Sequence, residues 1–446
     1  MADFQVAYLP IGVPTFHLES AQEQFDKSVR MLRSISGRIA CPEKMLLALP
    51  DLEAFLDTVS PGLVIVQNVT FAGAAYTGEI LRRLDGCPIL LWTLREPVAD
   101  GERLRLNSLT GAYSAANTLH AFDARFTYVF GSPEEPGVIG MVAAVVRAAE
   151  LRWKLRRGKI AAVGHTPQGF GFGRALDAEL LQAFGVTLES IEARELIDRA
   201  RGYTNEQCAE YLDRASRAMA GLDGVPEANR QDFARLYKAY SDYAEENGID
   251  ALASRCWPDF FSVYGTPVCA VLSMLNGSGV ASSCEADIYG ALSMYIGSQL
   301  TGGPAFFGDP VTLDEKENTI TYWHCGMAAC SLARKDTGAA VGVHPNRKIG
   351  PVMNFGCEAC GEVTVFRIGR KPDGRFRLFI LEGKALDKAR QFCGTSIVVQ
   401  TKSCALEVVK NSVRAGWEPH FAVAFGDIRP ELEVLADMLG LEACLF

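Results

Sequence analysis

Short apolar segments alternate with amphipathic segments over the first third of the chain. Four apolar runs have the length of buried strands, and the stretches between them, such as residues 21–36, carry apolar side chains at helical spacing. Alternating strands and helices are typical of a parallel sheet with helices on both faces. The four runs are FQVAYLPIG (4–12), LVIVQNV (63–69), CPILLWT (87–93) and FTYVFG (126–131). We therefore predict an N-terminal α/β domain over residues 1–156, ending at a basic break.

A second α/β unit begins at KIAAVGH (159–165). The glycine-rich turn QGFGFG (168–173) and a helix follow this strand. A strand, a glycine-rich turn and a helix in this order can bind an anion on the backbone N–H groups of the turn, but such glycines more commonly allow a tight strand-to-helix turn. Further along, the apolar run PVCAVLSML (267–275) is interpreted as strand. The second α/β domain is predicted to span residues 157–300.

From about residue 301 the pattern changes to short alternating segments. KPDGR (371–375) is a hairpin turn between two of them. The chain ends with one amphipathic helix, PELEVLADMLG (430–440). The fold class is thus predicted to be α/β, with two Rossmann-like α/β domains followed by a β-rich, antiparallel barrel-like domain over residues 301–446.

Composition excludes several classes of function. The 446 residues include 44 Lys and Arg against 53 Asp and Glu, giving a net charge of −9. An acidic chain with scattered basic residues is not expected to bind nucleic acid or an anionic membrane. No apolar run approaches the roughly 18 residues that span a bilayer. The 13 cysteines are scattered, and the pair Cys357 and Cys360 lacks a second pair for zinc. We expect a soluble cytoplasmic protein with reduced cysteines.

Two carboxylates follow predicted strands in the middle of the chain. GVASSC (279–284) leads into Glu285, and PAFFGD (304–309) ends in Asp309. At the carboxyl ends of strands in an open α/β sheet, these groups would face the crevice where ligands bind, and they could share a divalent cation. Spacing alone favours the alternative, in which Glu285 caps the next helix and Asp309 begins a turn. His420 opens a predicted strand, where a lone histidine is commonly a packed core or surface residue.

The order of these segments resembles the L-fucose isomerase and L-arabinose isomerase superfamily. RCWPDF (255–260) precedes a CEAD segment that contains Glu285, and a GALSM helix, an LTG turn and an aromatic strand ending in Asp309 follow. YWHCG comes next, and much later His420 leads a strand before a terminal LADMLG helix. The resemblance is one of motif over residues 250–446 and one of layout over the first 250 residues.

This resemblance implies an aldose–ketose isomerase, an intramolecular oxidoreductase. It implies that Glu285, Asp309 and His420 bind one divalent cation, typically Mn²⁺, a metal that two carboxylates and an imidazole suit. The cation would hold O1 and O2 of an open-chain sugar, and the two carboxylates would move a proton between C2 and C1 through a cis-enediol. Members of the superfamily are usually hexamers with shared pockets, so the resemblance also implies a homo-oligomer.

The resemblance points to further residues of the site. His324, in YWHCG, is interpreted as a fourth ligand, a substrate contact or a core histidine. Trp257 and Arg255 are expected to pack against the sugar or hydrogen-bond to it, although Trp257 fits the core equally well. His17 follows the first strand, where a neighbouring subunit contributes to the pocket in the superfamily. Asp287 is expected to orient a ligand.

The chain also departs from the superfamily. It is shorter than the L-fucose isomerases, with segments lost between Asp309 and His420, and Pro419 replaces the polar residue expected before the histidine. We therefore expect another aldose, with an altered substituent at C5 or C6 among the candidates. Two alternatives to an isomerase stay open at this point. One is a non-catalytic sugar-binding protein on the same scaffold, and the other is a dinucleotide-dependent oxidoreductase that uses the glycine turn.

Overall fold

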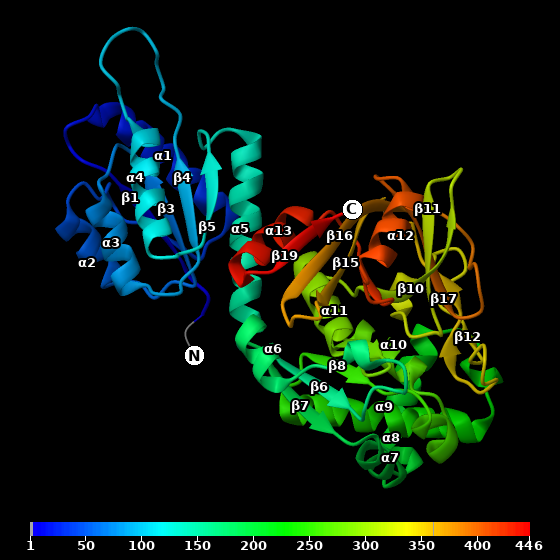
Figure 1. The fold of residues 1–446 in the computed structure, drawn as a ribbon. Coiled ribbons are helices and arrows are strands. Elements are labelled where there is room, and N and C mark those ends of the chain that lie inside the picture. The colour runs from blue at the N-terminus through cyan, green and yellow to red at the C-terminus, as the bar shows by residue number, and fades with distance from the viewer. Residues whose placement is uncertain (1–2, 360) are drawn as a thin grey trace. The chain divides into compact units, whose positions relative to one another are not determined.

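A computed structural model describes residues 3–359 and 361–446, so Cys360 lies outside the described residues. The chain forms two compact units: unit 1 comprises residues 1–153 and 430–440, and unit 2 comprises residues 154–429 and 441–446. Parallel sheets and a mixed, β-rich sheet confirm the predicted α/β class (Figure 1). The division into three domains stays a prediction.

Unit 1 is built on the parallel sheet expected from the first third of the chain, with strand order β2-β1-β3-β4-β5. Every residue of β1, β3 and β4 is buried, whereas β5 at the edge is partly exposed. Strands covered on both faces have this near-continuous apolar sequence. The strands are β1 (Val6–Ile11), β2 (Ile39–Ala40), β3 (Leu63–Asn68), β4 (Ile89–Thr93) and β5 (Phe126–Phe130); the helices are α1 (Leu18–Ile35), α2 (Leu49–Leu56), α3 (Ala74–Arg83), α4 (Ser108–Ala121), α5 (Pro136–Leu155) and α13 (Arg429–Leu439).

The parallel sheet of unit 2 has the strand order β7-β6-β8-β9. The order reverses between β6 and β8, so the loops that follow these two strands open a crevice of the kind in which α/β proteins bind ligands. The strands are β6 (Lys159–Val163), β7 (Thr187–Ile191), β8 (Ala251–Ser254) and β9 (Ala281–Cys284).

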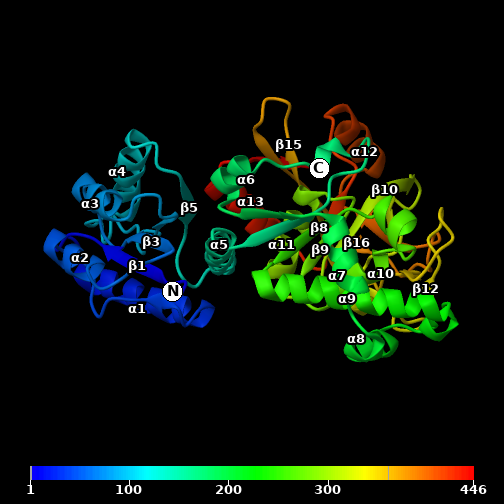
Figure 2. The same ribbon diagram turned by 90° about the horizontal axis from the view of Figure 1, so that it is seen from below.

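Helices pack against this sheet and against one another. The long α9 lies beside α7, α8 and α10, as Figure 2 shows. The segment interpreted as strand, 267–275, is instead the buried helix α10, because an apolar run of this length fits a buried helix as well as a strand. The helices are α6 (Asp177–Phe184), α7 (Ala193–Arg201), α8 (Asn205–Ala218), α9 (Glu227–Asn247), α10 (Cys269–Gly277) and α11 (Ile288–Thr301), with short helical turns at Gly171–Gly173, Leu222–Gly224, Phe260–Tyr264 and Cys330–Leu332.

The β-rich part of unit 2 is an eight-stranded mixed sheet in the order β14-β17-β11-β10-β18-β15-β16-β19. An additional pairing of β16 with β17 closes six of these strands into a ring. KPDGR forms the predicted hairpin turn between β15 and β16. The elements are β10 (Phe306–Asp314), β11 (Thr319–His324), β12 (Val341–Gly342), β13 (Val352–Met353), β14 (Phe355–Gly356), β15 (Gly361–Arg370), β16 (Phe376–Ala385), β17 (Thr395–Thr401), α12 (Ala405–Arg414), β18 (Phe421–Ala424) and β19 (Glu442–Leu445).

Asp309 does not lie at the end of a parallel strand. β10 continues past it to Asp314 and pairs antiparallel with β11 and β18, with a register shift between Pro310 and Thr312. A bulge of this kind lets a strand pass through a proline, which cannot donate a ladder hydrogen bond. Asp309 therefore reaches the site from the β-rich sheet.

Helix α11 connects the two sheets of unit 2. It contacts β8 and β9 of the parallel sheet and also β15 and β18 of the β-rich sheet. Residues Ile288–Gly297 of the helix are all buried, as expected of a helix with apolar residues on every side. Among the described residues, no helix combines the length and hydropathy that crossing a bilayer demands.

Candidate metal centre and active site

The turn between β9 and α11 has an unusual backbone. Glu285 and Ala286 adopt left-handed conformations, with φ of 58° and 54°. Such values are uncommon outside glycine and cost energy, and they concentrate where function requires them. The turn separates two carboxylates: Glu285 follows the strand, and Asp287 becomes the N-cap of α11 by accepting a hydrogen bond from the Gly290 N–H.

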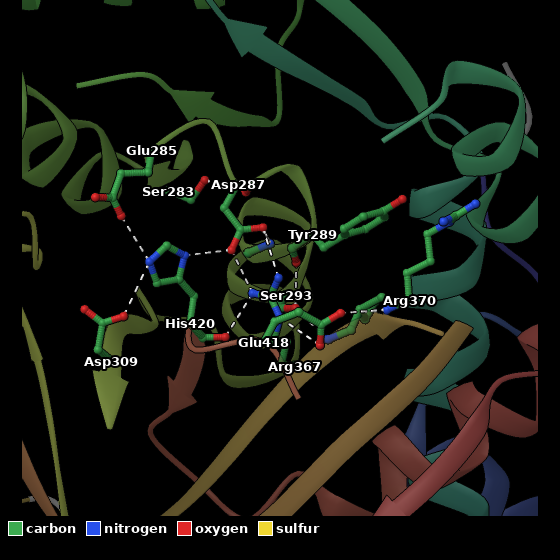
Figure 3. Close-up of polar contacts among 12 residues, drawn as sticks. Ser283, Glu285, Asp287, Tyr289, Ser293, Asp309, Arg367, Arg370, Glu418 and His420 are labelled. Atoms are coloured by element: carbon green, nitrogen blue, oxygen red, sulfur yellow. Dashed lines mark hydrogen bonds and ion pairs between the residues drawn. The ribbon is translucent and has the colours of Figure 1, made fainter. Parts of the chain in front are cut away.

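The imidazole of His420, immediately before β18, joins three carboxylates. Its Nε2 lies 3.1 Å from Oε2 of Glu285 and 3.4 Å from Oδ1 of Asp309. Its Nδ1 lies 2.9 Å from Oδ2 of Asp287, on the opposite side of the ring (Figure 3). The structure thus brings together Glu285, Asp309 and His420 from three separate segments.

Asp287 is held by a buried arginine. Nη1 and Nη2 of Arg367, on β15, donate to the two carboxylate oxygens of Asp287 at 2.8 and 3.2 Å, and Nη1 also donates to the backbone carbonyl of His420. Both side chains of the ion pair are at most 1% exposed. A buried pair with two hydrogen bonds fixes its members firmly, so Arg367 orients Asp287, and Asp287 orients His420.

His324, at the end of β11, faces the same point. Its Nε2 lies 3.9 Å from Oε2 of Glu285, beyond hydrogen-bond distance. The side chain is 2% exposed and its Nδ1 has no hydrogen-bond partner among the described residues. One ligand atom each from Glu285, His324 and His420 lies within 4.8 Å of the others. Buried imidazole nitrogens without partners are costly unless a ligand uses them.

These donors fit a divalent cation. Atoms that share a cation at about 2.2 Å stand roughly 3–4 Å apart, which is the range of the separations between the Nε2 atoms of His420 and His324 and the carboxylate oxygens of Glu285 and Asp309. Carboxylate oxygens with imidazole nitrogens suit Mn²⁺ and similar metals. Glu285, His324 and His420 each offer one ligand atom within 4.8 Å of the others, and Oδ1 of Asp309 lies 3.4 Å from Nε2 of His420.

The electrostatic interactions among the residues of the site favour charge separation. Burial lowers the pKa of His420, but hydrogen bonds with Asp287 and Glu285 outweigh it and raise the pKa to about 9. Burial raises the pKa of Asp287, yet Arg367 and His420 overcome this and hold it below its usual range. Because an ionised Asp287 can only accept, Nδ1 of His420 is the donor in their contact.

Burial decides the direction of the pKa shift for Asp309 and His324. It raises the pKa of Asp309 to about 6 and lowers that of His324 to about 4. Burial also works to raise the pKa of Glu285, but the hydrogen bond with His420 and the nearby histidine charges lower it overall.

Aromatic side chains line the site. The rings of Phe170 and Phe172 lie 6.1 and 5.3 Å from the imidazole of His420, and Phe307 lies 4.8 Å from it. Trp257 meets Phe170 edge to face and supplies a hydrogen bond that lowers the pKa of Glu285. Apolar rings exclude water and strengthen the electrostatic interactions between the polar groups.

The glycine-rich turn after β6 has a packing role here. A Cβ on Gly173 would lie 2.7 Å from Cα of Asp287, so only glycine allows the turn to approach the site so closely. The turn carries Phe170 and Phe172 to His420, which accounts for its sequence without a bound nucleotide.

The remaining predicted residues lie in different places. Trp257 is half-buried beside Glu285, whereas Arg255 is tied to Asp259 at 2.9 Å and to the carbonyl of Trp257. His17 belongs to unit 1, where it caps α1 by accepting a hydrogen bond from Ser20 N–H. Asp287 orients His420, as expected. Sequence reasoning missed Arg367, Phe170 and Phe172 as residues of the site. The glycine-rich turn was a signal for the two phenylalanines, which lie within it, whereas Arg367 on β15 had none.

Comparison with known proteins finds relatives that match over nearly the whole chain. The chain is 67% identical over 444 residues to a sulfoquinovose isomerase from Clostridium sp. (strain MSTE9), covering 99% of both chains. It is 38% identical to one from Priestia aryabhattai over the full length of both, and 35% identical to one from Alkalicoccus urumqiensis over 98% of each. No family model matches the sequence.

The fold, the site and these relatives together define an enzyme that interconverts an aldose and a ketose. The chain belongs to the sulfoquinovose isomerase family. A non-catalytic sugar-binding protein and a dinucleotide-dependent oxidoreductase are therefore not favoured.

Proposed function

We propose that this enzyme isomerises sulfoquinovose, a 6-deoxyglucose with a sulfonate at C6, to the corresponding 2-ketose. The convergence of Glu285 and Asp309 on Nε2 of His420 is the observation that carries the chemistry. The relatives' name supplies the substrate. A sugar altered at C6 also agrees with the departures of this chain from the L-fucose isomerases. We nevertheless propose that the enzyme belongs to the L-fucose isomerase and L-arabinose isomerase superfamily and follows its cis-enediol route.

We further propose that Glu285, Asp309 and His420 hold one divalent cation, Mn²⁺ being the expected metal, with His324 as a further ligand. When bound, such a cation supplies Lewis acidity toward O1 and O2 of the open-chain sugar. The fit rests on the donor set, in which Glu285, His324 and His420 each offer one ligand atom within 4.8 Å of the others.

The two carboxylates perform the proton transfers. One of them takes the proton from C2 of the aldose; the electron pair of that C–H bond forms the C1–C2 double bond of the enediol, and the C1=O π pair moves to O1, which accepts a proton from the other carboxylate. The first carboxylate then returns its proton to C1 through the C1–C2 π pair, while the second takes the proton from O2, whose electron pair forms the C2=O bond of the ketose. C2 is oxidised as C1 is reduced, so no external oxidant or reductant is needed, and the same two carboxylates serve the reverse reaction.

The surrounding residues fix the geometry. Arg367 and Asp287 hold the His420 ring so that Nε2 faces the carboxylates. Phe170, Phe172 and Phe307 cover that ring and keep water from the reacting atoms. Positioning of this kind accounts for a large share of the rate in enzymes with weak covalent chemistry.

We also propose a cellular location and an oligomeric state for the enzyme. No disulfide joins the twelve cysteines that the structure describes, which fits a reducing cytoplasm. We propose a homo-oligomer, a hexamer as in the resembling superfamily, with His17 of a neighbouring subunit near the pocket.

Incubation with sulfoquinovose and Mn²⁺, followed by NMR detection of the ketose, tests the function. We expect conversion to an equilibrium mixture. When the reaction is run in D2O, deuterium should appear at C1 to the extent that the carboxylate exchanges its proton with solvent before returning it. Conversion of L-fucose or L-arabinose in preference to sulfoquinovose would contradict the proposal.

A further inference from the structure

One exposed arginine lies near the site on an aromatic surface. The guanidinium of Arg347 stands over two rings, 5.4 Å from the centroid of Trp257 and 5.1 Å from that of Phe261. Stacking on aromatic faces holds a guanidinium in place while its N–H groups stay free to bind. Arg347 is therefore positioned and accessible.

Arg347 has no acidic partner among the described residues. Its neighbour Arg255 differs, because Asp259 neutralises it at 2.9 Å. Both arginines contact Trp257, but of the two only Arg255 forms an ion pair with a carboxylate among the described residues. A fixed guanidinium with unused donors is suited to an anion, and it matches the oxygens of a sulfonate or phosphate in pairs.

The loop that carries Arg347 is held by His344. Nδ1 of this histidine accepts hydrogen bonds from the backbone N–H groups of Asn346 and Arg347, both at 3.3 Å. Its ring packs edge to face on Phe261 at 5.0 Å, the ring over which the guanidinium lies. Backbone and side chain of Arg347 are thus fixed against the same surface.

Trp257 contacts both Arg347 and the reacting end of the site. One part of Trp257 hydrogen-bonds toward Glu285, and its face carries the guanidinium. An extended six-carbon chain spans roughly 6.5 Å, since each C–C bond of about 1.5 Å advances it by about 1.3 Å. A hexose of this length, with C1 and C2 at Glu285, can extend its C6 substituent past Trp257 toward Arg347.

We propose that Arg347 binds the anionic group at C6 of the substrate and so selects a sulfonated hexose over a neutral one. This inference rests on the proposed function. Arg347 acts in binding and takes no part in the proton transfer, so its loss changes KM and leaves kcat largely unaltered.

The test compares sulfoquinovose with 6-deoxyglucose, which differs from it only by the sulfonate. For Arg347→Gln we expect KM for sulfoquinovose to rise roughly 10- to 100-fold, as for a lost charge-assisted contact, with kcat within about threefold. With 6-deoxyglucose, kcat/KM of the variant stays within about twofold of the unmodified enzyme. Arg347→Lys recovers part of the lost affinity.

Arg174→Gln is the matched control. It removes the same charge from the other loop beside the site, where the guanidinium is held by Thr166. An equal rise in KM there would show that general positive charge attracts the substrate, and this would overturn the assignment. Unchanged sulfoquinovose kinetics in Arg347→Gln would overturn this inference alone, whereas an unmodified enzyme inactive on sulfoquinovose would overturn the proposed function with it.

Discussion

Nδ1 of His420 lies 2.9 Å from Oδ2 of Asp287, although 133 residues separate them in the sequence. This contact fixes which ring nitrogen faces the reacting groups: Nδ1 donates to Asp287, and Nε2 points toward Glu285 and Asp309. A histidine whose second nitrogen is held by a carboxylate is a more basic and better oriented metal ligand. The orientation of the whole site therefore depends on Asp287.

Asp287→Asn is expected to weaken cation binding by roughly 10- to 100-fold, because the neutral amide orients His420 less firmly. Titration of the metal-free variant with Mn²⁺, followed by electron paramagnetic resonance, measures this directly. Glu179→Gln provides a control, since Glu179 pairs with Arg370. Equal affinities in Asp287→Asn and the unmodified protein would show that the contact has no role in the metal site.

Glu285→Gln is expected to lower kcat by roughly 100- to 10,000-fold, the range of general acid–base catalysis. The substitution keeps the shape of the side chain and removes its ability to carry a proton. Exchange of the C2 deuteron of labelled substrate reports the proton transfer separately from binding. Full exchange in Glu285→Gln would assign the transfer to another group.

Removal of divalent cations by a chelator is expected to abolish activity and to lower the melting temperature, since bound metal stabilises the folded state. Added Mn²⁺ should restore both. His420→Ala should no longer bind one metal ion per chain. His324→Ala should still bind one, with reduced affinity, because it lacks only the additional ligand. Undiminished activity after complete removal of metal, checked by elemental analysis, would contradict the proposed centre.

Mild acid is expected to destabilise the protein through His344. Burial and the neighbouring Arg347 lower its pKa to about 4 in the folded state, against about 6.5 when unfolded. Between these values the unfolded chain binds the extra proton, so stability is lost as the pH falls from about 6.5 to about 4. Urea unfolding of the unmodified protein and of His344→Gln at pH 7.5 and 5.0 measures the difference. The variant should lose less stability, and an identical pH dependence would contradict this prediction.

Local patterns were enough for much of the secondary structure. The apolar runs at 4–12 and 63–69 became buried parallel strands, and the segment after Asp287 became helix α11. Periodicity works there because burial of one face or of both is a local property of a strand or helix. The same signal failed for α10, whose short apolar run is buried on all sides and so carries no period.

The site was less accessible to such reasoning. Spacing alone favoured capping and turn roles for Glu285 and Asp309, and it was the resemblance to sugar isomerases that grouped them with His420. The path of β10 beyond Asp309 depended on a bulge and on pairing with β11 and β18, neither of which has a local sequence signal.

The sequence by itself determined which segments form strands and helices and which side chains can donate to a cation or move a proton. Only the tertiary structure decided that Glu285, His324 and His420 share one point, that Arg367 orients the network, and that Arg347 stands free on Trp257. The physical reason is that secondary structure follows from neighbours a few residues apart. These contacts instead join positions up to 135 residues apart, and they exist only after two sheets have closed around one helix.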